Sequence, residues 1–360
     1  MSFALTTEEI GSLVAAGAVA PSGGNLQPWR VTARAASLEL RVDPDRSGGM
    51  VDVARSASTL ALGAFAENVA IESAARGLAH RLEPASTGDD EATVRVVFEG
   101  RGAPEAARSP LQRAIAARAT NRRAWDGTVI GDGDMGALAD AATSVGDGYT
   151  LRAVADEAEK RAVARALAEA DVVRTFNREL RAEMLSEMRW TDEEARGRAD
   201  GVDVATLELP EGALTGFKLM RSSLFVSLMV TKRRIRAMTE AALQASSHLC
   251  CITMPREPTP AALFDAGRAL ERVWLTATAR GLWMQPWSVA PFFALRAEVA
   301  RETLAPAEVA SIAAITRALD QAWAVGEARR AIFVFRLFRG EPPSKRAVRR
   351  PWESFTTIDR

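Results

Sequence analysis

Hydrophobic and polar positions divide the chain into helical and strand-like segments. Apolar residues that recur every three or four positions predict helices, and short alternating or continuous apolar runs predict strands. The predicted helices cover about 7–18, 54–78, 111–118, 133–143, 156–170, 171–199, 214–244, 260–282 and 306–325. The predicted strands are a hairpin within 29–44 and single strands at 92–100, 248–255 and 331–340. Strands and helices are interspersed, which indicates an α+β or α/β chain.

Two of the predicted helices resemble each other in sequence. The segment GAFAENVAIESAARGL from Gly63 aligns without a gap with GRALERVWLTATARGL from Gly267. Each copy is followed by a strand that ends in an EG or RG turn and a proline. An internal duplication explains this repeat, and the alternative is a chance likeness between alanine-rich helices. Duplication would give two related halves packed like a fused dimer.

Composition and charge exclude several classes of function. The 360 residues are enough for one large or two ordinary domains, and 46 basic residues balance 46 acidic ones. This balance gives no indication of nucleic-acid or membrane partners. The start of the chain lacks a basic, apolar leader, and Thr6 and Glu9 have the spacing of a helix capping box. The adjacent Cys250 and Cys251 are poorly placed to bridge, so a reducing, cytoplasmic setting is expected.

Common catalytic and metal motifs are missing from the sequence. There are two histidines and no G-x-S-x-G stretch, which disfavours a serine hydrolase. No Walker A or Rossmann glycine motif occurs, so a nicotinamide cofactor would have no domain of its own. His248 and Cys250 share a face of a predicted strand but lack further ligands with zinc-like spacing. No metal site is predicted.

The loop APSGGNLQPWRV, residues 20–31, has a composition suited to contact with a flat ligand. Proline and glycine fix a tight path that lets a ligand approach the main chain closely. Ser22 and Asn25 offer short donors and acceptors, and Gln27 can brace the loop or meet a polar ring edge. Pro28 and Trp29 are expected to pack the loop onto the following strand. A well-made helix-to-strand turn would have a similar composition.

This loop resembles the signature of the FMN-dependent nitroreductase superfamily, with Pro-Ser, Asn and Gln-Pro-Trp unbroken. The family's arginine element, usually near the start of the chain, resembles RATNRRAW at 118–125 here, and its basic C-terminal element resembles the tail RGEPPSKRAVRR. The loop after the second repeated helix, GLWMQPWS, corresponds to a segment near the flavin. The resemblance implies FMN-binding residues Pro21, Ser22, Gly23, Asn25, Gln27, Arg118, Thr120, Arg122, Gln285, Pro286, Lys345, Arg346 and Arg349, with Arg350 as a further tail candidate.

An FMN phosphate is anionic, and two arginines four residues apart on a helix would share one face toward it. Arg118 and Arg122 are expected to act in this way. Trp283 and Trp287 are equally explained as core anchors or as ring contacts.

The resemblance implies a nitroreductase-like α+β fold, a mainly antiparallel sheet flanked by helices. Two unequal halves, 1–105 and 110–360, would mimic the nitroreductase dimer, either as a monomer or within a homodimer. In that family the loop and the arginine element come from different subunits, so one complete FMN site per chain is expected. The layout is similar to the internally duplicated, single-chain branch that includes dormancy-associated and adenylation-domain-associated proteins.

The implied function is hydride transfer through flavin N5 between NAD(P)H and an unidentified small organic substrate. No catalytic side chain is identified. The alternatives are an FMN-binding or storage protein and a flavin-free interaction partner in a modification pathway. Residues 171–244, with Gly201 and Pro210 as hinges, are predicted to form a lid or a structural extension.

Overall fold

A computed structural model describes residues 3–84, 93–103, 109–209 and 212–359. The α-helices are α1 (Thr7–Ala18), α2 (Ser56–Ala75), α3 (Pro110–Ala117), α4 (Asp132–Thr143), α5 (Glu157–Phe176), α6 (Arg178–Ser186), α7 (Asp192–Arg198), α8 (Ala213–Leu219), α9 (Ser223–Met229), α10 (Lys232–Gln244), α11 (Pro260–Ala279), α12 (Val289–Val299) and α13 (Pro306–Ala322). The strands are β1 (Trp29–Arg34), β2 (Ser37–Val42), β3 (Leu78–Pro84), β4 (Thr93–Arg101), β5 (Thr150–Val154), β6 (Met188–Arg189), β7 (Val202–Asp203), β8 (His248–Pro255), β9 (Trp283–Pro286), β10 (Arg329–Phe338) and β11 (Thr356–Ile358).

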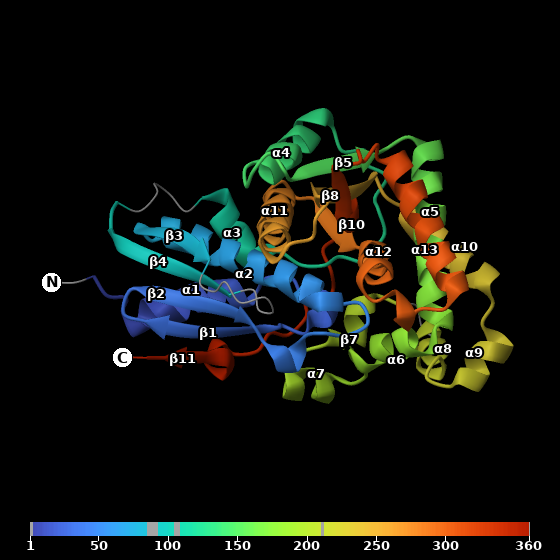
Figure 1. Ribbon diagram of the computed structural model, residues 1–360, viewed down its shortest axis with the longest axis horizontal. Coiled ribbons are helices and arrows are strands. Elements are labelled where there is room, and N and C mark those ends of the chain that lie inside the picture. The colour runs from blue at the N-terminus through green and yellow to red at the C-terminus, as the bar shows by residue number, and fades with distance from the viewer. Residues whose placement is uncertain (1–2, 85–92, 104–108, 210–211, 360) are drawn as a thin grey trace.

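The chain forms two lobes, each with a mainly antiparallel sheet flanked by helices, as Figure 1 shows. In the first lobe the strand order is β11-β1-β2-β4-β3, and in the second it is β5-β8-β10-β9. We leave β11 and the separate pair β6 and β7 aside and number the other strands in order within each half. Both sheets then have the order first, second, fourth, third. In both lobes the long helix, α2 or α11, follows the second of these strands. The predicted α+β architecture is therefore observed.

The two repeated helices pack against each other between the lobes (Figure 1). A methyl group built on Gly63 would overlap the carbonyl oxygen of Phe264, and one on Gly267 would overlap that of Leu60. Phe264 and Leu60 each stand three residues before the glycine of their own helix. The contacts are thus reciprocal in the register of the sequence repeat, and each glycine allows the opposite backbone to approach.

The halves differ most between their first two sheet strands. In the first half, a two-residue turn joins β1 to β2, and the predicted hairpin is confirmed. In the second half, residues 155–247, here called the insertion, separate β5 from β8 and hold α5 to α10. The stretch 171–199, predicted as one helix, is broken at Asn177 and by β6, and 214–244 forms three helices. Those two helix predictions were wrong.

The breaks in the insertion have local causes. Asn177, Ser222 and Thr231 accept hydrogen bonds through their side chains from backbone N–H groups of the next helix, so each one starts a new helix. The proposed hinge at Pro210 lies outside the described residues. Gly201 has φ of 77° and packs against the side chain of Arg189, so it occupies a tight, left-handed turn.

The C-terminal tail returns to the first lobe. β11 pairs in parallel with β1, and Val31 lies opposite Thr356. Phe355 is buried beside Trp29 and Phe65, with ring centroids 6.4 Å from each. Trp29 itself is fully buried, as predicted for the anchor of the loop before it. The tail from 341 to 350 therefore passes beside the loop at 19–28 on its way to β1.

Two structural findings bear on the remaining sequence predictions. Within the described ranges, no helix has the length and apolar character to cross a bilayer. The same ranges contain no group of three or more histidine, cysteine, aspartate or glutamate side chains arranged to hold a metal ion. Strand β8 is almost completely buried, and both cysteines on it are inaccessible.

Candidate functional site

The loop between α1 and β1 follows a tight path through left-handed residues. Gly24, Asn25 and Gln27 have φ values of 54°, 55° and 54°. Asparagine tolerates this region better than glutamine, so Gln27 needs stabilising contacts. The hydroxyl of Ser22 accepts a hydrogen bond of 3.0 Å from the backbone N–H of Gln27 and closes the loop. A side chain at position 24 would collide with the carboxyl group of Glu187 from the insertion.

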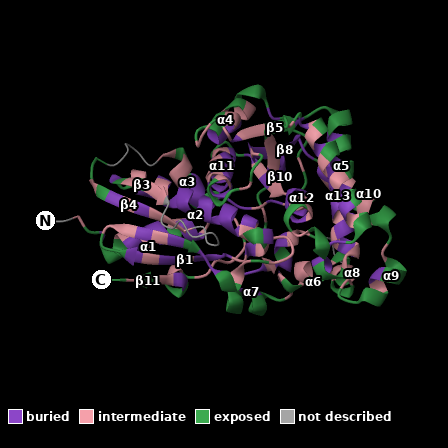
Figure 2. Cartoon of the chain, in the orientation of Figure 1, coloured by how far each residue is buried: buried purple, intermediate pink, exposed green. Residues whose placement is uncertain are grey.

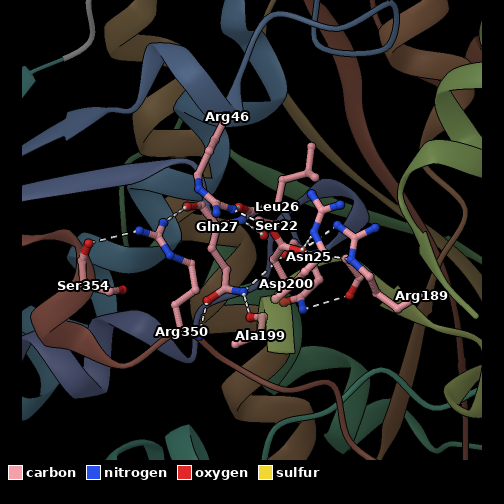
Figure 3. A network of polar contacts seen from close by, with 12 residues as sticks. Ser22, Asn25, Leu26, Gln27, Arg46, Arg189, Ala199, Asp200, Arg350 and Ser354 are labelled. Atoms are coloured by element: carbon pink, nitrogen blue, oxygen red, sulfur yellow. Dashed lines mark hydrogen bonds and ion pairs between the residues drawn. The ribbon is translucent and has the colours of Figure 1, made fainter. Parts of the chain in front are cut away.

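The side chains of Asn25 and Gln27 connect this loop to the insertion and to the tail. Asn25 Nδ2 donates to the carbonyl oxygens of Gly201 and Val348, each at 3.0 Å. Gln27 Nε2 donates to Ala199 O at 2.8 Å, and its Oε1 accepts from the backbone N–H of Arg350 at 2.9 Å. Figure 3 shows Gln27 between Ala199 and Arg350. Three segments far apart in sequence therefore meet at this loop.

A buried ion-pair cluster fixes the insertion beside the loop. Asp200 accepts from Arg189 Nη2 at 2.6 Å and from Arg46 Nη1 at 2.8 Å (Figure 3). Burial alone would raise the pKa of Asp200, but the two arginines outweigh it and hold that pKa below its usual value. Arg46 also donates to Leu26 O at 3.0 Å. We call Asp200 with Arg46 and Arg189 the latch.

The arginine element at 118–122 is not helical, which corrects one sequence prediction. Helix α3 ends at Ala117, and Arg118 has an extended ψ of 130° as its C-cap. Thr120 then pairs with Met284 in a parallel bridge. Because the backbone leaves the helix, Arg118 and Arg122 do not share a face. Arg118 donates to Val19 O of the loop, whereas Arg122 donates to Thr206 O of the insertion at 3.0 Å.

The basic tail residues separate into two groups. Arg349 lies at the loop, where it donates to Asn25 Oδ1 at 2.6 Å and approaches Val19 O at 3.5 Å. Arg350 contributes its backbone N–H to Gln27 and lies 5.2 Å over the ring of Phe355. Lys345 pairs instead with Asp192 and Asp203 of the insertion, and Arg346 donates to Ala116 O and Ala117 O at the end of α3.

The segment after α11 is a strand, β9, and not a loop. Gln285 Oε1 accepts from Arg336 Nε at 2.7 Å, and Pro286 lies opposite Phe335 in the sheet. Arg336, which sequence reasoning did not single out, also donates to Arg123 O at 2.7 Å. Trp283 donates to Gly340 O, so its ring nitrogen has a structural partner. Gln285 is thereby tied to the 118–125 segment and not to the 19–28 loop.

The structure brings Arg118 and Arg349 together at one carbonyl oxygen, that of Val19. Burial lowers the pKa of Arg118, and burial together with the charge of Arg118 lowers that of Arg349 to about 9. Burial likewise lowers the pKa of Arg122 to about 10. These lowered pKa values show that burial removes solvent from all three guanidinium groups and that nearby carboxylates do not fully replace it.

A buried glutamate, Glu271 on α11, is the nearest counter-charge to this pair and was not predicted. Its carboxylate lies 3.5 Å from Arg118 Nε, and the side-chain amide of Asn68 on α2 stands beside it. Burial raises its pKa to about 7, and Arg118 offsets only part of that rise. The Nε atoms of Arg118 and Arg349 make no hydrogen bond with a described residue. Its alignment with Glu67 in the other repeat was the sequence signal that could have found Glu271.

The predicted residues therefore fall into two neighbouring groups. Pro21, Ser22, Gly23, Asn25, Gln27, Arg118 and Arg349 belong to or contact the 19–28 loop, whereas Thr120, Arg122, Gln285, Pro286, Lys345 and Arg346 contact the insertion, β9, β10 or α3. A cavity of about 580 Å³ lies elsewhere, at the first turns of α2 and α11, and includes Ser56 and Leu263. None of the predicted residues lines that cavity.

Comparison with known proteins gives a family match for the first part of the chain. Residues 2–125 match the Nitroreductase family. This segment, about a third of the chain, holds the loop, the repeated helix α2 and the arginine element. Together with the antiparallel sheets and flanking helices, the match supports the predicted nitroreductase-like fold.

Relatives of greater coverage are distant. The chain is 29% identical over 337 residues to the uncharacterized protein MT1398 of Mycobacterium tuberculosis (strain CDC 1551 / Oshkosh), covering 92% of this chain and 46% of that protein. The chain thus spans about half the length of this relative.

Solved nitroreductases are similar at lower identity. NfnB from Mycobacterium smegmatis in complex with NADPH is 15% identical, with a TM-score of 0.40, covering 70% of this chain and 98% of NfnB. Iodotyrosine deiodinase bound to FMN and 3-iodo-L-tyrosine is 13% identical, with a TM-score of 0.36, covering 67% of this chain and 95% of the deiodinase. Likeness at this level carries no argument about ligand or activity.

Proposed function

We propose that this chain is an FMN-dependent oxidoreductase of the nitroreductase type that passes hydride between NAD(P)H and a small organic substrate. The observation that carries the proposal is the meeting of Arg118 and Arg349 at the 19–28 loop, where the Nε of each makes no hydrogen bond with a described residue. A flavin phosphate would supply the negative charge that these buried guanidinium groups lack. The family match of the segment that contains both the loop and Arg118 supports this assignment.

Each part of the site has a separate task in this proposal. Arg118 and Arg349 would bind the phosphate, and the left-handed loop from Ser22 to Gln27 would let the ring system approach the backbone. The flavin, when bound, supplies the two-electron chemistry. The protein orients it and excludes water. Glu271 would hold Arg118 in position from behind, because its carboxylate lies on the α11 side of the guanidinium.

We further propose that the two lobes are duplicated nitroreductase-like halves and that only one FMN site per chain is complete. The matched strand orders and the reciprocal glycine contacts support the duplication. The loop comes from the first half, and the arginine element and tail come from the second. The equivalent of Glu271 in the first repeat, Glu67, is already paired with Arg268 and Arg272. Arg268 also pairs with Asp265, so both guanidinium groups beside Glu67 already have carboxylate partners.

A second candidate, an FMN-binding protein whose insertion blocks turnover, is favoured by the position of residues 187–208. Arg122 is bonded to Thr206, Lys345 to Asp192 and Asp203, and Gln27 to Ala199. Carbonyl and carboxylate oxygens of the insertion thus already engage three of the side chains that the resemblance assigns to FMN. The insertion would have to move for these residues to contact FMN.

One experiment tests the function and distinguishes the two candidates. Purified protein is titrated with FMN, followed by flavin absorbance and fluorescence, and the holoprotein is then mixed anaerobically with NADPH. Saturation at about one FMN per chain with rapid bleaching is expected for the oxidoreductase. Binding without bleaching would support the blocked form.

Variants locate the phosphate site. Arg118→Gln and Arg349→Gln should each weaken FMN binding about ten- to a hundredfold, the effect of one lost charge-assisted contact. Arg152→Gln, on β5 in the other lobe, is the matched control. Unchanged affinity in both folded variants would contradict the proposal.

A further inference from the structure

The segment from Ala213 to Thr239 differs from the rest of the chain in charge. The chain as a whole has equal numbers of acidic and basic residues. This segment has six basic residues and no aspartate or glutamate: Lys218, Arg221, Lys232, Arg233, Arg234 and Arg236. A block of one sign on a globular surface attracts a partner of the opposite sign.

The same segment exposes large apolar side chains. Eight large hydrophobic residues are exposed in the described part of the chain, and five of them lie here. Leu224 and Leu228, 69% and 71% exposed, stand four residues apart on one face of α9, and Met229 beside them is 63% exposed. The other two are Leu219 and Met238. We call these five residues and the six basic ones the α8–α10 patch.

Contacts on the inner side hold this patch in place. Val226 of α9 is buried, and Ser223 accepts a hydrogen bond of 3.0 Å from Arg181. Phe217 of α8 packs on Trp190 with ring centroids 5.6 Å apart. Because α9 is fixed through Val226 and Ser223, its opposite face presents the leucines to solvent. Figure 1 places α8 and α9 at the edge of the molecule, and Figure 2 shows most of this region as exposed.

Part of the basic charge is used internally and the rest faces outward. Arg236 pairs with Glu169 at 2.5 Å, Lys232 lies 5.9 Å over the ring of Phe176, and Arg221 lies 6.0 Å over Trp190. The cation–π contacts leave the positive charge uncompensated. Arg233 and Arg234, at the start of α10, are exposed. In the sequence, basic residues therefore stand on both sides of the exposed leucines.

We propose that the α8–α10 patch docks on the surface of a bilayer that contains anionic lipids. Aliphatic side chains bordered by lysine and arginine suit the boundary between acyl chains and acidic headgroups. A second copy of the chain would bring the same positive charge against itself. Two helices of seven residues are about 10 Å long each, which is small for a stable protein–protein interface.

This proposal goes beyond the proposed oxidoreductase function and differs from the sequence-based expectation of no membrane partner. It concerns surface contact only, since the described helices include no membrane-crossing candidate. A docked chain would have access to substrates dissolved in the bilayer. The site around Arg118 and Arg349 is formed by other residues, so the two proposals can fail independently.

Vesicle sedimentation of the full chain tests the proposal. Vesicles of phosphatidylcholine with about 30% phosphatidylserine are compared with pure phosphatidylcholine at low and physiological salt. Binding to the anionic vesicles that weakens with salt is expected. The variant Lys232→Gln/Arg233→Gln/Arg234→Gln should bind about a hundredfold more weakly. Leu224→Gln/Leu228→Gln/Met229→Gln should also lose binding, whereas Val129→Gln, which changes a 70% exposed residue elsewhere, should not.

Several results would overturn the proposal. Failure of the wild-type chain to sediment with anionic vesicles is one, and equal sedimentation of all variants with matched melting temperatures is another. Concentration-dependent dimerisation in the ultracentrifuge that the leucine variant abolishes, without vesicle binding, would assign the patch to a second copy. Tighter binding to polyglutamate than to vesicles, insensitive to the leucine variant, would assign it to an acidic protein.

Discussion

Glu67 and Glu271 occupy the same position in the two repeated helices, yet their surroundings differ. Both side chains are fully buried. Glu67 accepts from Arg268 Nε at 2.9 Å and from Arg272 Nε at 2.5 Å, both on the opposite helix. The aligned positions facing Glu271 hold Ala64 and Asn68, and its charge partner is Arg118 at 3.5 Å.

The comparison shows that two aligned positions of the sequence repeat can have different surroundings. A paired glutamate joins the helices on one side. On the other side, where the aligned positions hold no arginine, a carboxylate with a raised pKa lies beside Arg118. A buried charge without full compensation costs stability, so its presence is more easily explained by a binding role than by packing. Both glutamates lie on the two helices that cross, and this crossing is the feature that their surroundings have in common.

The largest expected effect concerns that crossing. Gly63→Ala and Gly267→Ala each place a methyl group against the opposite backbone, so the helices must separate. We expect each to lose about 3 kcal/mol of unfolding free energy, at the upper end for overpacking. Gly136→Ala, in α4 with open space around it, should be neutral or stabilising by under about 1 kcal/mol. Urea denaturation measures all three.

Equal losses of unfolding free energy at Gly63 and Gly267 would show that the helix crossing is energetically symmetric. A loss of unfolding free energy at one glycine only would indicate that one lobe can shift to accommodate the added methyl group. If both alanine variants match the wild type, the close approach of the helices does not exist in solution.

The second effect distinguishes Glu271 from Glu67 by the pH dependence of stability. The folded pKa of Glu271 is about 7, above its ordinary 4.5, so the folded chain binds more protons between these values. Stability should therefore fall as pH rises from about 4.5 to about 7, by up to about 3 kcal/mol for this group. Glu271→Gln should remove that fall and be more stable than wild type at pH 8.

Glu67→Gln is the matched control. It leaves Arg268 and Arg272 without their shared carboxylate, and we expect a loss of about 1.5–3 kcal/mol at pH 8. Burial also raises the pKa of Glu187 to about 7. The stability of both variants should therefore keep some dependence on pH. Unfolding curves from pH 5 to pH 8 give the result. The same pH dependence in wild type and Glu271→Gln would contradict the assignment.

Local signals allowed much of the fold to be predicted from sequence. Thr6 and Glu9 form the expected capping box, and Trp29 anchors the loop as expected. The gapless repeat marks the two helices that cross between the lobes. The failures also have local causes. The continuous apolar pattern at 214–244 concealed the caps at Ser222 and Thr231, and β9 and β11 are too short to show a period of their own.

The site was harder to predict because its geometry depends on long-range contacts. The spacing of Arg118 and Arg122 suggested one helical face, but pairing of Thr120 with Met284 extends the backbone between them. The loop residues were found through their motif. Their partners Gly201 and Ala199 lie 176 and 172 residues away in a segment that has no motif. The approach of Glu271 to Arg118 likewise joins two distant segments, and no local pattern encodes it.

The third effect concerns the insertion. The first half has a short turn at the corresponding place. Asp200→Asn removes the charge that Arg46 and Arg189 share, and should loosen residues 187–208 by about 1.5–3 kcal/mol. Hydrogen exchange of the Gly201 and Val202 amides, which donate to Asn25 O and Glu187 O, should accelerate about tenfold or more. FMN release after dilution should accelerate in parallel if the insertion covers the flavin.

Asp192→Asn is the control for that variant, because its pair with Lys345 is exposed and should contribute little. Faster exchange without faster FMN release would separate the latch from flavin access and favour a purely structural insertion. Unchanged exchange in Asp200→Asn would mean that the latch does not hold this segment.

The smallest effect concerns the helices that directly precede the first sheet strand of each half, α1 before β1 and α4 before β5. Thr6 caps α1 and accepts from Glu9 N at 3.1 Å, whereas α4 begins after Gly131 without a side-chain cap. Thr6→Ala should cost about 1 kcal/mol, and Gly131→Ser, at an extended backbone with open space, should gain a few tenths. Thermal unfolding of both variants measures this difference. If Thr6→Ala costs nothing, the end of α1 frays in solution and the first half does not depend on its cap; if Gly131→Ser destabilises, the turn before α4 is held by contacts that a cap disturbs.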